Sequence, residues 1–152
     1  MRNKGFTLLE ILFAIAILTI AITIVTFSFS KLNSQQALDK SADLVVSVFN
    51  EARSLTLSSK GDSQYGVYIE GSQVTLFKGD TYSSSDPNNA ITNLNSLVNI
   101  RDVTLSSGGT SVVFKRLTGN TDDTGTLEIF LIAIPENFHT VTINGIGVVE
   151  LE

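Results

Sequence analysis

A long apolar run near the N-terminus constrains the fold of this chain more than any other feature. From Phe6 to Phe29 the run holds 24 residues, and its only charged side chain is Glu10. A helix of that length, at a rise of about 1.5 Å per residue, is about 36 Å long and exceeds the roughly 30 Å of a bilayer's hydrocarbon core. The run therefore predicts a membrane-spanning helix.

Two ordinary membrane-targeting segments compete with this interpretation. A cleaved secretory signal has a shorter apolar region, of about 7–15 residues, with small residues after it. Here the run is longer, and the small residue, Gly5, stands before it. A plain signal anchor remains an alternative, because Arg2 and Lys4 on one side of the run satisfy the positive-inside rule.

Glu10 separates these alternatives. A carboxylate inside an apolar span is costly, so it indicates a function and needs a positive partner. Cleavage between Gly5 and Phe6 would create an α-amine one helical turn from Glu10, and in an array of such helices the carboxylate of one chain would meet the amine of its neighbour. In a simple anchor, Glu10 would instead lie at the headgroup level, favoured by the helix dipole.

The segment Lys4-Gly5-Phe6-Thr7-Leu8-Leu9-Glu10 resembles the processing signal of type IV prepilins and type II secretion pseudopilins. The resemblance implies cleavage by prepilin peptidase between Gly5 and Phe6, N-methylation of Phe6 and filament assembly through Glu10. It also implies other pilin-like subunits as partners, and storage in the cytoplasmic membrane as a single-pass protein, in contact with lipid through the helix and with the head extracytoplasmic. Major pilins commonly have a proline within this helix, whereas the first proline here is Pro87, so the similarity favours a minor pilin or pseudopilin.

The helix is expected to continue beyond the apolar run. A stripe of apolar residues recurs at spacings of three and four, and the polar sequence from Ser58, with Gly61 as C-terminal cap, predicts the end of the helix. The stripe consists of Leu38, Ala42, Val45, Phe49, Ala52 and Leu55/Thr56. We expect a leader at 1–5, a transmembrane or filament-core helix at 6–30, an amphipathic helix at 31–58 and a β-rich head at 59–152.

Short β-rich runs separated by turn residues follow the helix, which predicts an α+β fold with a mostly antiparallel head. A hairpin is expected at 65–69 and 74–77, followed by an exposed excursion at 82–99 with a short turn at 91–97. Further strands are expected at 100–105, 111–116, 127–134, 140–143 and 148–151.

Three segments, one late in the helix and two in the head, are similar to H-type minor pseudopilins and their minor-pilin relatives. They are Asn50-Glu51-Ala52-Arg53-Ser54, with the strand Tyr65-Gly66-Val67-Tyr68 soon after it, and the closing segment from Val141 to Val149. This similarity implies a β-sandwich or a pair of sheets packed on the C-terminal half of the helix.

Composition argues against several other functions. The net charge is −5, and removal of Arg2 and Lys4 with the leader makes it about −7, so neither nucleic acid nor anionic lipid is an expected partner of the head. No cysteine is present, which excludes thiol chemistry. The single histidine, His139, has no recognisable catalytic partners, and the oxygen-rich loop 118–125 lacks the EF-hand spacing for calcium. We expect no enzyme activity, no cofactor and no metal.

The sequence thus leaves two hypotheses. The first is a structural subunit, a minor pilin or pseudopilin of a type IV pilus-like or type II secretion filament. The alternative is an uncleaved, membrane-anchored extracytoplasmic binding module or adhesin that contacts a ligand through the 82–99 excursion.

Overall fold

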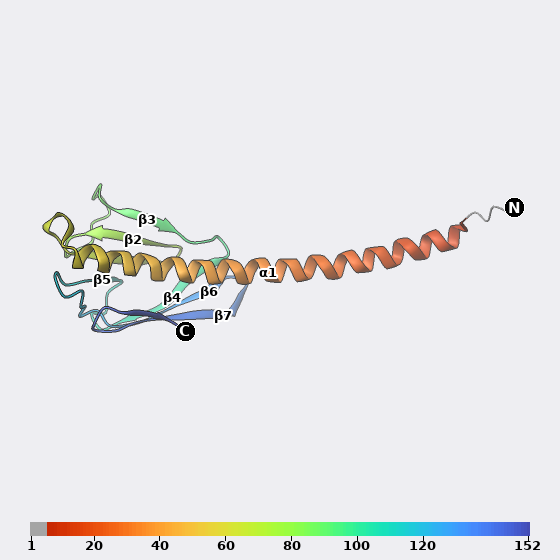
Figure 1. Cartoon of the computed structure of the whole chain (residues 1–152). Helices are drawn as coiled ribbons and strands as arrows, with labels where there is room; N and C mark the ends of the chain where they lie inside the picture. Colours follow the sequence, from red (N-terminus) through yellow and green to blue (C-terminus); the bar gives the residue numbers. More distant parts are fainter. Residues whose placement is uncertain (1–5) are drawn as a thin grey trace. The chain divides into compact units, whose positions relative to one another are not determined.

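The computed structural model describes residues 6–152, and the chain divides into two compact units at Gln35/Gln36. Gly5 and the rest of the predicted leader lie outside the described residues. One long helix, α1 (Leu8–Leu57), contributes its first part to unit 1 and its second part to unit 2. All the strands belong to unit 2, so the predicted α+β fold class is confirmed (Figure 1).

The C-terminal end of α1 lies where the sequence predicts it, but the capping residue differs. Ser59, not Gly61, is the left-handed residue that follows the helix, with φ of 47°. Gly61 lies within a short 3₁₀ helix, η1 (Lys60–Asp62). The chain therefore leaves the helix two residues before Gly61. The Thr56 hydroxyl, at the end of α1, accepts the N–H of Tyr65 at 2.9 Å and holds the first strand beside the helix.

The first sheet has the strand order β3-β2-β1-β5, and every pair in it is antiparallel. The predicted hairpin is confirmed as β1 (Tyr65–Glu70) and β2 (Gln73–Lys78). The expectation for 82–99 is wrong in part, because this excursion contains β3 (Ala90–Asn93), which pairs with β2. The fourth strand, β5 (Ser111–Val113), is shorter than predicted.

The second sheet has the order β4-β6-β7-β8 and is also antiparallel throughout. It consists of β4 (Val98–Leu105), β6 (Gly125–Leu131), β7 (Ile134–Ile143) and β8 (Val149–Leu151). The prediction of a single strand at 127–134 is wrong. The chain reverses at residues 132–133, and β6 and β7 form a hairpin. This turn contains no glycine, asparagine or aspartate, so nothing in the apolar sequence signals a turn there.

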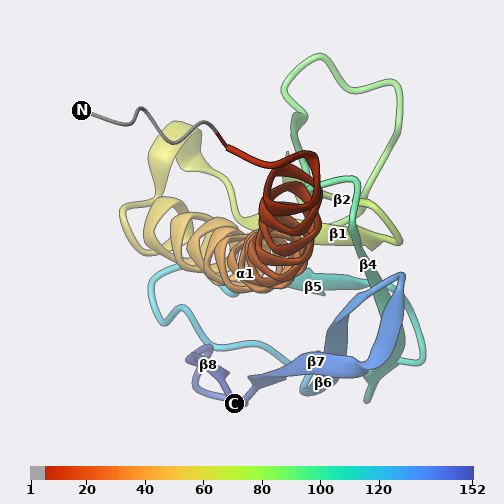
Figure 2. The ribbon, with the colours of Figure 1, turned by 90° about the vertical axis from the view of Figure 1, so that its right-hand side faces the viewer.

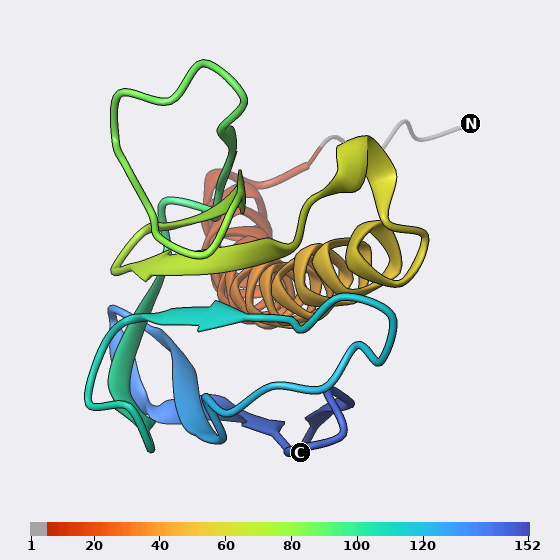
Figure 3. The same ribbon diagram turned by 90° about the vertical axis from the view of Figure 1, so that its left-hand side faces the viewer.

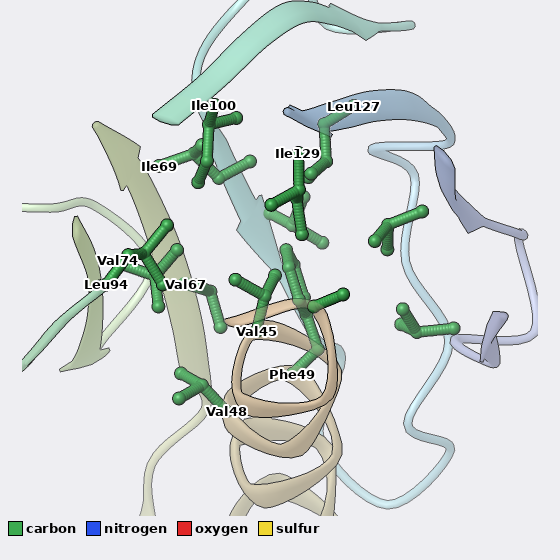
Figure 4. Packing of buried hydrophobic residues seen from close by; sticks show 14 of the residues in the cluster. Val45, Val48, Phe49, Val67, Ile69, Val74, Leu94, Ile100, Leu127 and Ile129 are labelled. Atoms are coloured by element: carbon green, nitrogen blue, oxygen red, sulfur yellow. The ribbon is translucent and has the colours of Figure 1, made fainter. Parts of the chain in front are cut away.

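One hydrophobic core joins the helix of unit 2 to both sheets. In the views along α1 (Figures 2 and 3), the two sheets occupy different sides of a common interior and the helix closes its open flank. Figure 4 shows Val45 and Phe49 of α1 directed toward Val67 and Val74 of the first sheet and Ile129 of the second. The predicted stripe is buried from Leu38 to Ala52, each member at 1% exposure or less.

A second, smaller aromatic cluster covers the outer face of the first sheet. Phe77 lies opposite Gly66 in the register, and a Cβ on Gly66 would lie 2.5 Å from the Phe77 ring, so only glycine lets this ring lie flat on the strand. Tyr82 stacks on Tyr68 at 4.0 Å between ring centroids and meets Phe77 edge-on at 5.6 Å. These contacts hold the start of the 82–89 loop against the sheet.

Candidate functional site

The N-terminal end of α1 is built by a side-chain cap. The hydroxyl of Thr7 accepts the N–H of Glu10 at 3.2 Å, and the carbonyl of Thr7 accepts the N–H of Ile11 at 3.3 Å. Thr7 is therefore the N-cap, and Glu10 occupies the third helical position, as in a Thr-x-x-Glu capping box. No role is predicted for Thr7 from the sequence, although the spacing of Thr7 and Glu10 is typical of a capping box and could have identified it.

Phe6 and Glu10 lie on one face of this helix end, four residues apart. They line one end of a shallow hollow, and the remaining residues that line it are aliphatic. Both residues are exposed, Phe6 at 80%. The hollow is lined by Phe6, Glu10, Ile11, Ala14, Ile15 and Leu18. The carboxylate of Glu10 is thus the single acidic group among the residues that line this hollow.

The helical segment Leu8–Val25 of unit 1 is apolar and has no buried side chain. The segment Leu8–Val25 has a mean hydropathy of 2.8, none of it is buried, and it is long and apolar enough to cross a membrane. Its threonine hydroxyls bond to carbonyls of the same helix: Thr19 donates to Ala16 and Thr23 donates to Thr19, both at 2.8 Å. Because these polar groups are satisfied within the helix, the surface is suited to lipid or to other apolar helices.

The predicted cleavage and methylation sites are only partly within the described chain. Phe6 and Glu10 are brought to the same helix end, whereas Gly5 lies outside the described residues. Cleavage at Gly5, methylation of Phe6 and the assembly role of Glu10 stay predictions.

The structure joins two segments on which the similarity to H-type pseudopilins rests. The Arg53 guanidinium, near the end of α1, donates from Nε to the carbonyl of Gly119 at 3.3 Å and from Nη2 to the carbonyl of Ile146 at 3.2 Å. Ile146 lies in the closing turn between β7 and β8. Arg53 therefore ties the loop that precedes β6 and this closing turn to the helix.

The oxygen-rich loop 118–125 uses its carboxylates within the head. Asp122 pairs with Lys115 at 2.6 Å, and Asp123 accepts the N–H of Val113 at 3.0 Å. The Thr121 hydroxyl accepts the N–H of Asp123 at 3.1 Å. Across residues 6–152, no group of three or more histidine, aspartate or glutamate side chains is placed to hold a metal ion.

Comparison with known proteins connects the N-terminal helix with a family motif. Residues 1–26 match the family described as the prokaryotic N-terminal methylation motif. A search of curated proteins by sequence gave no match.

Solved structures resemble about three quarters of the chain. The type IV minor pilin FimU of Pseudomonas aeruginosa PAO1, in crystals of space group P21, matches with a TM-score of 0.60 at 15% identity, over 78% of this chain and 90% of that one. Its P65 crystal form gives 0.58 at 15% identity, over 76% and 92%. The minor pseudopilin EpsH of the type 2 secretion system of Vibrio cholerae matches with a TM-score of 0.55 at 18% identity, over 76% and 95%. At this level of identity the likeness establishes the fold.

Proposed function

We propose that the chain, which carries the N-terminal methylation motif and the fold of the type IV pilin and pseudopilin family, is a minor subunit of a type IV pilus-like or type II secretion filament. The observation that carries this proposal is the first turn of α1. There Thr7 caps the helix and Glu10 is the single carboxylate at the start of an apolar segment with no buried side chain.

Processing would create the partner that Glu10 needs. Prepilin peptidase cuts between Gly5 and Phe6 and methylates the new amine of Phe6. The charged amine and the Glu10 carboxylate then lie one turn apart on each chain, and pairing between neighbouring chains neutralises both charges in an apolar bundle. An unpaired carboxylate there would be strongly disfavoured, so Glu10 selects a subunit register.

Membrane storage precedes assembly in this scheme. The segment Leu8–Val25 spans the cytoplasmic membrane once, with Arg2 and Lys4 on the cytoplasmic side and the head extracytoplasmic. Lipid and neighbouring helices are equally apolar, so the helix exchanges one for the other at little cost in burial. The absence of proline before Pro87 supports a minor rather than a major subunit.

Substitutions at Glu10 test the proposal, and two of them separate charge from capping. Glutamine retains the capping box but removes the charge, whereas alanine removes both. We expect Glu10→Gln and Glu10→Ala each to remain in the membrane and to be lost from sheared filaments, measured by quantitative immunoblotting. Glu136→Ala, at an exposed glutamate on β7, is the matched control and is expected to assemble normally.

The same experiment can contradict the proposal in two ways. If Glu10→Gln assembles as the unmodified chain does and Glu10→Ala does not, Glu10 acts through helix capping and not through its charge. Mass spectrometry of the mature N-terminus supplies the second criterion. A chain beginning at N-methylated Phe6 supports the proposal, whereas an intact Met1 favours the alternative of an uncleaved, membrane-anchored binding module.

A further inference from the structure

The two sheets of the head end in four edge strands, which differ in how they are protected. An edge strand exposes unpaired N–H and C=O groups that can pair with another chain, and proteins usually block such edges with charges, bulges or covering segments. In each antiparallel ladder, alternate residues direct their backbone groups away from the neighbouring strand. The outward groups of each edge can therefore be identified from the register.

Three of the edges are guarded. On β5 the outward N–H of Val113 is bound by the Asp123 carboxylate at 3.0 Å. On β4 the outward N–H of Ile100 donates to the carbonyl of Gly71 at 2.7 Å, and a register shift with Asp102 at φ of 50° follows. β8 is only three residues long and carries the acidic Glu150.

β3 has no comparable guard. Leu94 donates its N–H to Ser72 at 2.9 Å and Thr92 lies opposite Val74, so the backbone groups of Ile91 and Asn93 point away from β2. Within residues 6–152, no hydrogen bond engages these outward groups. The strand contains no charged residue, and the side chain of Ile91 is 58% exposed. Figure 1 shows β3 at the outer side of β2.

A groove adjoins this free edge. It lies between α1 and the connection from β3 to β4, holds about 270 Å³, and is lined by Ala37, Lys40, Ser41, Leu44 and Asn93–Asn95. Leu44 is 39% exposed, although the α1 positions beside it, Ser41 and Val45, are buried. Lys40 is exposed at the rim, and none of the ion pairs within residues 6–152 includes it.

We propose that the free edge of β3 and this groove bind an extended strand of a partner protein. The main chain of the incoming strand pairs with the N–H and C=O groups of Ile91 and Asn93, and alternate side chains face the groove. Of the side chains of the incoming strand that face the groove, an aliphatic one contacts Leu44, and an acidic one two residues away pairs with Lys40. The structure thus specifies a strand in which an aliphatic and an acidic residue share one face.

Charge decides against symmetric pairing of β3 with the β3 strand of a second copy of this chain. Two β3 strands paired edge to edge would offer Lys40 only the residues Ala90 to Asn93, none of which is acidic. With the proposed function as premise, the partner strand is assigned to another pilin-like subunit, the nearest source of one in a filament.

The probe for this site is a fluorescent peptide, Thr-Val-Thr-Glu-Thr-Val-Thr, added to the full chain in detergent micelles. Its valines and its glutamate share one face. We expect saturable binding by fluorescence anisotropy, and about tenfold weaker binding of the peptide with lysine in place of glutamate. Lys40→Glu is expected to reverse this preference. Ile91→Lys should weaken binding about tenfold, whereas Ile146→Lys, at an isoleucine of similar exposure (62%), should leave it unchanged.

Amide hydrogen exchange of the unmodified chain gives a second measurement that does not depend on any variant folding. Bound peptide should slow exchange at the N–H groups of Ile91 and Asn93, and leave Thr92, which already bonds to β2, unchanged. No saturable binding, protection at another edge, or equal effects of Ile91→Lys and Ile146→Lys would overturn the proposal.

Discussion

His139 on β7 and Asp39 on α1 meet at 2.9 Å, Nε2 to Oδ1, and connect the second sheet to the helix across 100 residues of sequence. The histidine, for which the sequence indicates no catalytic partner, is 28% exposed in its side chain and has this defined contact. His139→Ala should lower the free energy of unfolding by about 0.5–1 kcal/mol, since one partly exposed hydrogen bond is lost. Urea unfolding measures this, and Glu136→Ala on the same strand should change it by less than about 0.5 kcal/mol.

Arg53 should contribute more to the free energy of unfolding of the head than any surface ion pair does. Its two hydrogen bonds, to Gly119 and Ile146, fix two loops to α1, and Arg53→Ala leaves both carbonyls without their charged donor. We expect a loss of about 1–3 kcal/mol and faster amide exchange in both loops. Arg116→Ala removes a surface pair with Asp62 and should cost about 0–1 kcal/mol. Equal effects of the two substitutions would contradict this ranking.

Gly147 and Gly108 offer a matched pair of glycines with nearly the same backbone conformation. Their φ values are 74° and 70°, but a Cβ on Gly147 would lie 1.9 Å from the carbonyl oxygen of Gly119, whereas nothing lies within 4 Å of one on Gly108. Gly108→Ala should therefore cost only the left-handed strain of about 1–2 kcal/mol. Gly147→Ala should cost at least about 2 kcal/mol more, because two backbones must separate. Thermal unfolding of both variants tests the difference.

Asp86 gives the loop 82–89 a dependence on pH. Its carboxylate accepts the backbone N–H and the side-chain amide of Asn88, both at 2.8 Å, and these bonds lower the pKa of Asp86 below its ordinary value of 3.8, the backbone bond contributing more. The stabilisation is complete above the pKa of the unfolded chain and is lost as the pH falls through the lowered pKa of the folded chain. Carboxyl chemical shifts measured across this range should show the lowered pKa directly.

Asn88→Ala tests the cause of that shift. It removes the side-chain bond and keeps the backbone bond, so the pKa of Asp86 should rise only part of the way to its ordinary value. A pKa that does not move would show that the amide side chain contributes nothing.

Sequence patterns predicted elements whose signals are local. The stripe from Leu38 to Ala52 gave the buried face of α1, and the turn between 69 and 74 gave the first hairpin. β3 was missed because its four residues are mostly exposed and pair with β2 only through the backbone. The turn at 132–133 was missed because it lies within an apolar run.

The sequence predicted which residues form the candidate site, but not the contacts that position them. The spacing of Phe6 and Glu10 predicts that the two residues lie near the same helix end, but Phe6 precedes the N-cap Thr7 and lies outside the helix itself. The cap by Thr7 depends on where the helix begins, and the contacts of Arg53 join positions 66 and 93 residues apart, which no local pattern encodes.

The segment Leu8–Val25, with no buried side chain, has a thermodynamic consequence of its own. A folded unit with its own hydrophobic core has a free energy of unfolding that does not depend on the protein concentration. Unit 2 has such a core. The segment Leu8–Val25 has none in the single chain, so its free energy depends on which lipid or helices surround it and on their concentration. Mass action therefore governs one end of the molecule, and intramolecular packing governs the other.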